Sequence, residues 1–237
     1  MIMSDNNFIG QQIAKKSAGF AAANLVENGM TVGLGTGSTT AFFIEKLAQR
    51  CEEGLKIQAV ATSSQSQKLA LEKGIPLIDI NTLFSIDLTV DGADEIDANK
   101  TMIKGGGGAL LREKIVASMS KEMVIIVDQA KLVKKLGQVP LPVEIVPFAY
   151  PATIYRLEQL GYQGKIRTHD EKKLYCTDNG NYIYDIYFKE KLEKAEQVHQ
   201  RLSEIVGVVE SGLFIGLAGR IIVGYNDGKV KIFTELK

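Results

Sequence analysis

The chain has 237 residues, enough for one large domain or for one domain that carries a smaller second one. Apolar residues make up 45% and charged residues 24%, the balance of an ordinary globular protein, and the formal net charge is zero. The absence of a basic excess argues against a nucleic-acid partner, and the lack of any apolar run near the roughly 20 residues that cross a bilayer argues against a membrane partner.

The first two thirds of the chain alternate between helical periodicity and short apolar runs. This alternation predicts an α/β fold with a doubly wound, mainly parallel sheet, whose ligand lies beyond the carboxyl ends of the strands. The expected helices are 9–26, 39–54, 63–74, 109–120 and 128–137. The expected strands are 30–35, 57–62, 75–80, 86–94 and 122–128.

The composition changes near Val139, where four of the five prolines fall within residues 139–151. A strand at 143–148 and the elements after it predict the order β-α-β-β-α-β of a smaller ferredoxin-like α+β domain. Those later elements are a helix at 152–161, a two-strand run at 172–188 that turns at Asp178–Gly180, a helix at 191–207 and a strand at 208–214.

The expected catalytic α/β domain is therefore 1–138 together with 215–237, and the small domain is 139–214, each boundary within five residues. The closing run 219–233 predicts a hairpin that returns to the large sheet.

The loop "GLGTGSTT", Gly33 to Thr40, lies between an expected strand and helix. Glycines admit an anion close to the backbone, and a helix N-terminus offers unpaired N–H groups. Thr36, Ser38 and Thr39 add hydroxyl donors suited to phosphate oxygens. The loop matches neither the dinucleotide nor the nucleotide-phosphate fingerprint, and a tight turn with a capping hydroxyl is the alternative.

The loop "DGADEID", Asp91 to Asp97, places four carboxylates directly after an apolar strand. Asp91 and Asp94 flank Gly92 and Ala93, small residues that would let a ligand approach, so we favour a functional role for these two aspartates. In one interpretation, one carboxylate handles the protons of sugar hydroxyls while another stays ionised. For Glu95 and Asp97 a solvated acidic turn is the preferred interpretation. The fit to a calcium loop is poor.

In "KGGGGALLREK" four glycines separate Lys104 from a helix that carries Glu113 in its first turns. Such a turn presents several backbone N–H donors to one anion, in the manner of an oxyanion hole, and Lys104 adds a positive charge. A surface linker is the alternative, although linkers rarely lie between a buried strand and an amphipathic helix.

In the stretch "DQAKLVKKLG", Asp128 is expected to cap a helix and Lys131 to lie in its first turn. The helix dipole makes a lysine at this end unfavourable unless a bound anion compensates for its charge, so Lys131 is a candidate for binding phosphate. Lys134 and Lys135 are expected to be solvated.

The cysteines and histidines offer no metal or redox spacing. Cys51 and Cys176 are expected to be reduced thiols of a cytoplasmic protein, and the N-terminus lacks the layout of a signal peptide. His169 and His199 lie far from every glycine motif in the sequence, which weakens a catalytic triad or a histidine-ligated metal site.

Together, "GLGTGSTT", "DLTVDGADEID", "KGGGGALLREKIVA", "LPVEIVPF" and "TDNGNYIYDI" closely resemble ribose-5-phosphate isomerase of type A, in order and over nearly the whole chain. The resemblance implies an enzyme that interconverts ribose 5-phosphate and ribulose 5-phosphate in the pentose phosphate pathway. It further implies that no metal or other cofactor is needed, that the sugar phosphate is the small-molecule partner, and that the protein is a homodimer or a dimer of dimers.

The same resemblance assigns residues to roles. Catalysis falls to Glu113, Asp91, Asp94 and Lys104. Substrate binding falls to Thr36, Gly37, Ser38, Thr39, Asp91, Gly92, Ala93, Asp94, Lys104, Gly105, Gly106, Gly107 and Lys131. Which aspartate opens the sugar ring stays open. Gly219-Arg220 stands where the family more often has Ala-Asp, a departure that could alter a subunit contact or a local loop.

Three other classes share such sheets and glycine loops. A sugar-phosphate sensor would need no Glu113 with Lys104 and would normally carry a DNA-binding segment, and none is visible. An acyl-CoA transferase would need a glutamate nucleophile and a larger pocket. An amino-sugar phosphate deaminase would want an active-site histidine, while both histidines fall in the expected small domain. The isomerase is the preferred interpretation.

Overall fold

The computed structural model describes residues 2–170, 173–192 and 194–236. The chain divides into two compact units. The large unit comprises Met1–Ala93, Arg112–Leu132 and Leu217–Lys237, and the small unit comprises Asp94–Leu111 and Val133–Gly216. The sequence had placed 94–111 in the larger domain, whereas in the structure this segment belongs to the small unit.

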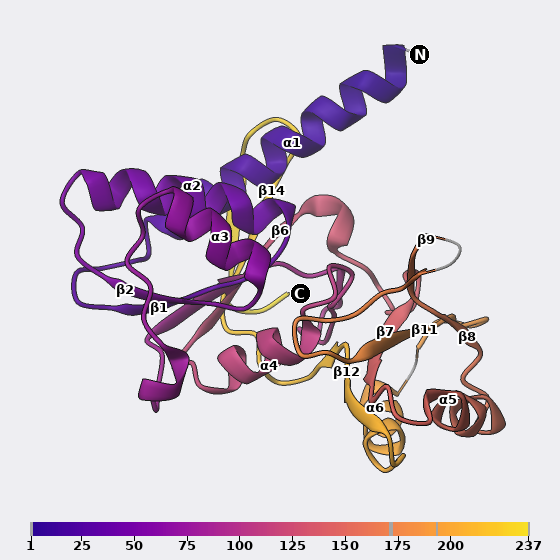
Figure 1. The fold of residues 1–237 in the computed structure, drawn as a ribbon. Helices are drawn as coiled ribbons and strands as arrows, with labels where there is room; N and C mark the ends of the chain where they lie inside the picture. Colours follow the sequence, from indigo (N-terminus) through magenta and orange to yellow (C-terminus); the bar gives the residue numbers. More distant parts are fainter. Residues whose placement is uncertain (1, 171–172, 193, 237) are drawn as a thin grey trace. The chain divides into compact units, whose positions relative to one another are not determined.

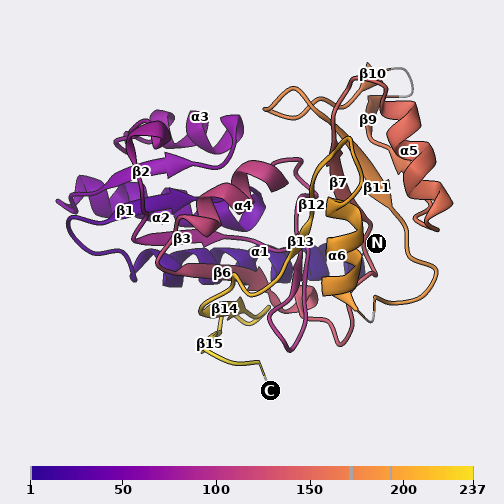
Figure 2. The ribbon, with the colours of Figure 1, turned by 90° about the horizontal axis from the view of Figure 1, so that it is seen from below.

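The large unit is an α/β unit, and Figure 1 and Figure 2 together label its helices and strands. Its helices are α1 (Ile2–Ala23), α2 (Ser38–Glu52), α3 (Ser64–Glu72) and most of α4 (Leu110–Ser118), with 3₁₀ turns η1 (Ile80–Thr82) and η2 (Gln129–Lys131). Its strands are β1 (Thr31–Leu34), β2 (Gln58–Ala61), β3 (Leu88–Asp91), β6 (Met123–Asp128), β14 (Ile221–Gly224) and β15 (Val230–Phe233). No helix of the described ranges has the length and apolar character needed to cross a membrane.

The large sheet has the strand order β15-β14-β6-β3-β1-β2, and the six strands can be followed in this order by their labels in Figure 2. Every neighbouring pair is parallel except β14 with β15, so the predicted doubly wound, mainly parallel sheet and its closing hairpin are confirmed. All six residues of β6 are buried, as expected for a strand covered on both faces. In Figure 1, α1, α2 and α3 lie on one side of this sheet and α4 on the other.

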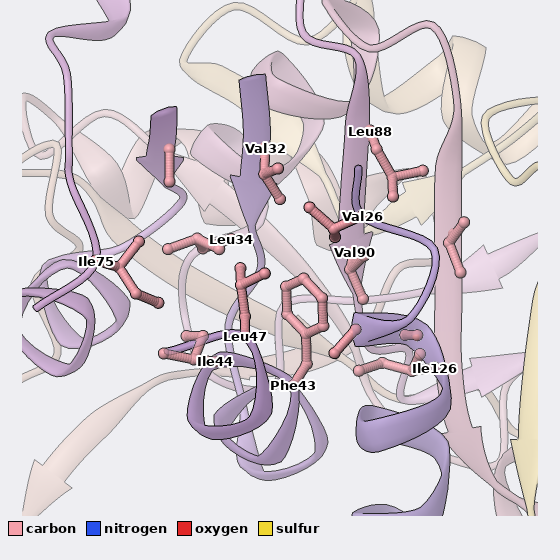
Figure 3. Packing of buried hydrophobic residues seen from close by; sticks show 14 of the residues in the cluster. Val26, Val32, Leu34, Phe43, Ile44, Leu47, Ile75, Leu88, Val90 and Ile126 are labelled. Atoms are coloured by element: carbon pink, nitrogen blue, oxygen red, sulfur yellow. The ribbon is translucent and has the colours of Figure 1, made fainter. Parts of the chain in front are cut away.

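The main core of the large unit lies between the sheet and α2 (Figure 3). Phe43, Ile44 and Leu47 of α2 project onto Val32 and Leu34 of β1, and all five are buried. Each such side chain stabilises the fold by about 1.5–3 kcal/mol relative to an exposed one.

The helix α1 packs closely on α2 because the residues of α1 at the contact are small. Ala18 and Ala22 are fully buried, and a β-carbon at Gly19 would come within 2.7 Å of the Phe43 amide nitrogen. The alanine-rich sequence of α1 is thus the reason that the two helices can lie backbone to backbone.

The small unit is built around a four-stranded antiparallel sheet of order β12-β7-β11-β8. Its helices are α5 (Tyr150–Gln159) and α6 (Ala195–Ser203). Its strands are β4 (Glu95–Ile96), β5 (Met102–Ile103), β7 (Leu141–Ile145), β8 (Gly164–Ile166), β9 (Thr168–Asp170), β10 (Lys173–Leu174), β11 (Tyr182–Ile186), β12 (Val208–Ser211) and β13 (Leu213–Phe214). The order of the four-stranded sheet is that of the predicted ferredoxin-like unit.

One predicted strand of the small unit is wrong. Residues 173–174 pair with β9 rather than with β11, and β8 takes the place of the second strand of the motif. The predicted turn is present, since the Gly180 amide donates to the Thr177 carbonyl oxygen at 2.9 Å. Residues 171 and 172 of the predicted run lie outside the described residues.

The strand predicted at 75–80 in the large unit is also absent. Leu77 forms only an isolated bridge with Ala59, and the chain then enters η1. Pro76 has no N–H to donate, and the Asp79 carboxylate accepts the Asn81 amide at 2.9 Å, which favours a turn over a continued strand.

The Gly219-Arg220 departure has a local explanation within the large unit. Arg220 donates to Glu122 with two hydrogen bonds of 2.7 Å, and a β-carbon at Gly219 would come within 2.8 Å of the Glu122 side chain. The hydrogen bond from Arg220 lowers the pKa of Glu122, and the same bond raises the pKa of Arg220. The pair joins the ends of two neighbouring strands, because Glu122 precedes β6 and Arg220 precedes β14.

We predict that Glu122→Gln lowers the free energy of unfolding by about 0.5–1 kcal/mol at pH 7, a value discounted because both side chains are about one third exposed. Since the folded pKa of Glu122 is lowered, its contribution is full above the unfolded pKa and is lost as the pH falls through the folded pKa. Urea unfolding should therefore show a difference in the free energy of unfolding between the parent protein and Glu122→Gln. This difference should be smaller at low pH than at pH 7. Glu27→Gln, at an exposed glutamate, is the control. An equal loss of unfolding free energy in both variants would show that the Glu122–Arg220 ion pair does not stabilise the fold.

Candidate active site

The large sheet reverses its winding between β1 and β3, where ligands of doubly wound sheets bind. The loops that leave these two strands are joined by the backbone. The Gly35 amide donates to the Val90 carbonyl oxygen at 2.9 Å, and the Thr36 amide donates to the Asp91 carboxylate at 3.0 Å. The structure thus brings the first two predicted motifs together within the large unit.

Asp91 is fully buried at the end of β3. Its Oδ1 accepts the amides of Thr36 at 3.0 Å and Gly92 at 2.7 Å. A β-carbon at Gly35 would come within 2.2 Å of Oδ1, so only glycine leaves room for the carboxylate in this orientation. The Asp91 carboxylate is held in one orientation at the carboxyl edge of the sheet.

In the loop Gly33–Thr40, the Thr36 hydroxyl does not face solvent, unlike the hydroxyl donor that the sequence suggested. The Thr36 hydroxyl is turned into a buried cluster and lies 2.8 Å from the hydroxyl oxygens of both Thr62 and Ser63. Ser38, by contrast, is exposed, and Thr39 is half-buried. Of the three predicted hydroxyl residues, only Ser38 and Thr39 are accessible to solvent.

The start of α2 supplies further donors. Gly37 is the N-cap residue, with φ at 116°, and within the described residues no side chain caps this helix. The first N–H groups of the 15-residue helix therefore have no side-chain acceptor and point along the positive end of its dipole. This is the geometry of an anion site.

Lys131 was predicted in the first turn of a helix, but in the structure it is the last residue of the 3₁₀ turn η2. Residues 129–131 form only a 3₁₀ turn, so the helix expected at 128–137 is wrong. The Asp128 cap is present, with Oδ1 accepting the Ala130 amide at 3.0 Å. The helix stops because the Val133 amide donates to the Ile96 carbonyl oxygen at 2.9 Å instead of to the carbonyl one turn back. Lys131 itself is half-buried, and Lys134 and Lys135 are exposed as predicted.

Glu113 falls in the first turn of α4 and is 4% exposed. It belongs to the large unit together with Thr36, Gly37, Ser38, Thr39, Asp91, Gly92, Ala93 and Lys131. The other predicted residues, Asp94, Lys104, Gly105, Gly106 and Gly107, belong to the small unit.

Lys104 follows β5 in the small unit and is 2% exposed. Its amide donates to the Gly212 carbonyl oxygen at 2.9 Å, and its ammonium lies 5.3 Å from the centroid of the Phe214 ring. The aromatic face attracts the ammonium and holds a buried cation in position.

The glycine loop, Gly105–Gly108, follows Lys104 directly. Gly105 and Gly108 have φ of 98° and 82°, which L side chains rarely adopt, and the Gly108 amide donates to the Gly105 carbonyl oxygen at 2.9 Å. The Gly106 amide donates to Asp94 at 2.8 Å, so Asp94 and the loop are brought together. Asp94 and Gly106 also line a cleft of about 340 Å³ in the small unit.

The solvated interpretation of Glu95 is wrong. Glu95 is 2% exposed, and its two oxygens accept the amides of Gly137, Gln138 and Val139 at 2.7–2.8 Å. Three amide donors compensate for the removal of a charge from water. Asp97 is half-buried and accepts the Asn99 and Thr101 amides within its own turn.

Neither cysteine is in a disulfide, as predicted. Among the described residues, no three His, Cys, Asp or Glu side chains are grouped so that they could hold a metal ion. Both histidines are in the small unit, where His199 Nδ1 lies 3.0 Å from the Ser211 hydroxyl.

Residues 58–228 match the family model of ribose 5-phosphate isomerase A, also called phosphoriboisomerase A. The chain belongs to this family. A ribose-5-phosphate isomerase A of Protochlamydia amoebophila is 52% identical over 219 residues, 92% of this chain and 94% of the relative. One of Bacillus mycoides is 50% identical over 214 residues, 90% of this chain and 96% of the relative.

Solved structures of ribose 5-phosphate isomerases have the same fold. A D-ribose-5-phosphate isomerase in complex with phospho-erythronic acid is 39% identical with a TM-score of 0.88, and the match covers 93% of this chain and 97% of the other. The ribose 5-phosphate isomerase of Plasmodium falciparum is 35% identical with a TM-score of 0.89, covering 94% and 98%.

Sequence reasoning missed several residues that support the family motifs. Glu144, fully buried, accepts hydrogen bonds from Thr177, Asn179 and Asn181 at 2.9–3.2 Å, which explains the polar side chains of "TDNGN". The density of amide and hydroxyl side chains in that turn was a signal for a buried acceptor.

Arg167 was also missed, and it contacts the glycine loop from the small unit's sheet. No local pattern marks it, because its partner Asp185 is 18 residues away and lies beside it only through the pairing of β8 with β11.

Proposed function

We propose that the chain interconverts D-ribose 5-phosphate and D-ribulose 5-phosphate through an enediolate, without a metal ion. The observation that carries the proposal is the buried carboxylate of Glu113 in the first turn of α4, at the position that the family resemblance gives to the catalytic base. A carboxylate removed from bulk water is suited to exchange a proton with carbon rather than with solvent.

The reaction moves a carbonyl group between C1 and C2 of the open-chain sugar. Glu113 removes the C2 proton of the aldose, and the electron pair of that bond forms the C1–C2 double bond of the enediolate. Glu113 then returns the proton to C1, the hydroxyl proton of O2 passes to O1, and the carbonyl reforms at C2. The proton count balances, and no oxidant or second substrate is required.

Lys104 and the N–H groups of the glycine loop are assigned to the developing oxyanion. Preorganised donors are most effective where water is excluded, and the burial of Lys104 supports this assignment.

Asp91 and Asp94 are assigned to opening of the furanose ring and to proton transfer on hydroxyl groups, with Gly92 and Ala93 leaving room for the sugar. Ser38, Thr39 and the start of α2 are assigned to the phosphate, together with Lys131. A fixed phosphate sets which carbon faces the base.

The family resemblance also supports a homodimer or dimer of dimers that acts in the cytoplasm, in the non-oxidative pentose phosphate pathway. Sugar phosphate is the proposed partner, with no nucleic acid and no membrane.

The function is tested by an assay of the purified chain with ribose 5-phosphate, alongside allose 6-phosphate and arabinose 5-phosphate, with and without a strong chelator. We expect conversion of ribose 5-phosphate to ribulose 5-phosphate that the chelator leaves unchanged. Absence of this conversion would refute the proposal, and inactivation that added metal reverses would refute its metal-free mechanism.

We predict that Glu113→Gln retains substrate binding and loses about 10²–10⁴-fold in kcat, the usual contribution of a general base. Steady-state kinetics and inhibition by phospho-erythronic acid measure the two quantities separately. Near-normal turnover in this variant would remove Glu113 from the role of base.

We predict that Lys131→Ala mainly raises KM, because a phosphate anchor contributes equally to the ground state and the transition state. Lys134→Ala, at an exposed lysine of the same segment, should keep the parent kinetics. A defect of Lys131→Ala confined to kcat would contradict the assignment.

A further inference from the structure

The backbone of the glycine loop is held at each of its first three carbonyl groups by side chains of the small unit. Arg167 Nη1 donates to the carbonyl oxygens of both Gly105 and Gly106 at 3.1 Å. The Tyr175 hydroxyl donates to the carbonyl oxygen of Gly107 at 3.3 Å. A loop of four glycines would otherwise have more conformational freedom than any other four residues.

These contacts also set the direction of the amide groups, because a trans peptide is planar and its C=O and N–H point in opposite directions. By holding the Gly106 oxygen, Arg167 fixes the direction of the Gly107 N–H. By holding the Gly105 oxygen, it fixes that of the Gly106 N–H, which Asp94 accepts at 2.8 Å.

Gly107 is an exposed donor of the loop. Within the described ranges no group accepts its N–H, and the residue is exposed, whereas the N–H groups of Gly106 and Gly108 both have acceptors. The Gly106–Gly107 peptide therefore keeps a fixed and available N–H.

Arg167 is itself fixed. Its guanidinium forms a two-point ion pair with Asp185, with donor–acceptor distances of 2.8 and 2.5 Å, and both side chains are largely buried. A planar guanidinium can make this pair and still direct Nη1 at two carbonyl oxygens, which an ammonium cannot do.

Tyr175 closes the other side of the loop. A β-carbon at Gly108 would come within 2.1 Å of its hydroxyl oxygen, so the two pack with no space between them. Burial raises the pKa of Tyr175, which keeps the hydroxyl protonated and able to donate.

We propose that Arg167, assisted by Tyr175, is a positioning residue for the isomerisation: it aims the Gly107 N–H at the oxyanion of the enediolate. This inference rests on the proposed function and adds to it a residue that acts through the backbone of the glycine loop. The loss of Arg167 would leave the side chains of Glu113, Asp91, Asp94 and Lys104 in place but would remove the two hydrogen bonds that hold the carbonyl groups of Gly105 and Gly106.

The test compares Arg167→Ala with the parent protein. We expect kcat for ribose 5-phosphate to fall about 10–100-fold, somewhat less than when an oxyanion donor is removed outright, with KM within about threefold. Inhibition by phospho-erythronic acid, whose carboxylate imitates the charged enediolate, should weaken by a factor similar to the fall in kcat.

Arg156→Ala is the matched control. Arg156 is also an arginine of the small unit that donates to a backbone carbonyl, that of Val206 at 3.2 Å, but this carbonyl is outside the glycine loop. Its kcat, KM and inhibition should equal those of the parent protein. If neither the parent nor Arg156→Ala isomerises ribose 5-phosphate, the proposed function fails; if both do and Arg167→Ala equals them, only this inference fails.

A folded Arg167→Ala protein whose kcat falls less than threefold, or whose loss lies entirely in KM, would overturn the proposal. If circular dichroism shows that this variant does not fold, Arg167→Lys takes its place, because lysine keeps the charge but holds one carbonyl at most. A fall in kcat at constant KM in Arg167→Lys supports the proposal, and parental kcat overturns it.

Discussion

The hydrogen bond from the Thr36 amide to the Asp91 carboxylate is the contact on which the candidate site of the large unit depends. It joins the loop after β1 to the loop after β3, at the place where the sheet reverses its winding. Asp91 is fully buried, and its carboxylate accepts the backbone amides of Thr36 and Gly92. The missing β-carbon of Gly35 makes this approach possible. The start of α2 follows at once, so one arrangement of backbone sets both a carboxylate and an anion site.

In both the acidic stretch 91–97 and the glycine-rich stretch 105–108, polar groups of the backbone pair with polar groups of side chains by hydrogen bonds. Each carboxylate of 91–97 accepts backbone N–H groups: Asp91 from Thr36 and Gly92, Asp94 from Gly106, Glu95 from residues 137–139, and Asp97 from its own turn. In the stretch 105–108 the backbone carbonyl groups are the acceptors, and side chains donate to them. Without side chains the glycines let Arg167 and Tyr175 reach their carbonyl oxygens, so the segment that looks most flexible in the sequence is closely held.

Much of this could be predicted from the sequence, because periodicity and turn residues report local structure. The parallel sheet, the ferredoxin-like order, the closing hairpin and the reduced cysteines all follow from such patterns. Three of the failures share a physical cause, which is a contact distant in sequence. The helix after Asp128 stops because Val133 donates to Ile96, and Glu95 is buried because residues 137–139 supply three amides. Arg167 was invisible for the same reason, since only the pairing of β8 with β11 brings it beside Asp185.

The position of β14 has a consequence for biosynthesis. This strand comes from the last residues of the chain, yet it lies inside the large sheet, between β6 and β15. During translation β6 therefore presents an apolar, unpaired edge to its surroundings for as long as the small unit is being made. The sheet can close only after the whole small unit has been made, so the nascent chain before that stage is the species most exposed to misassembly and most in need of chaperones.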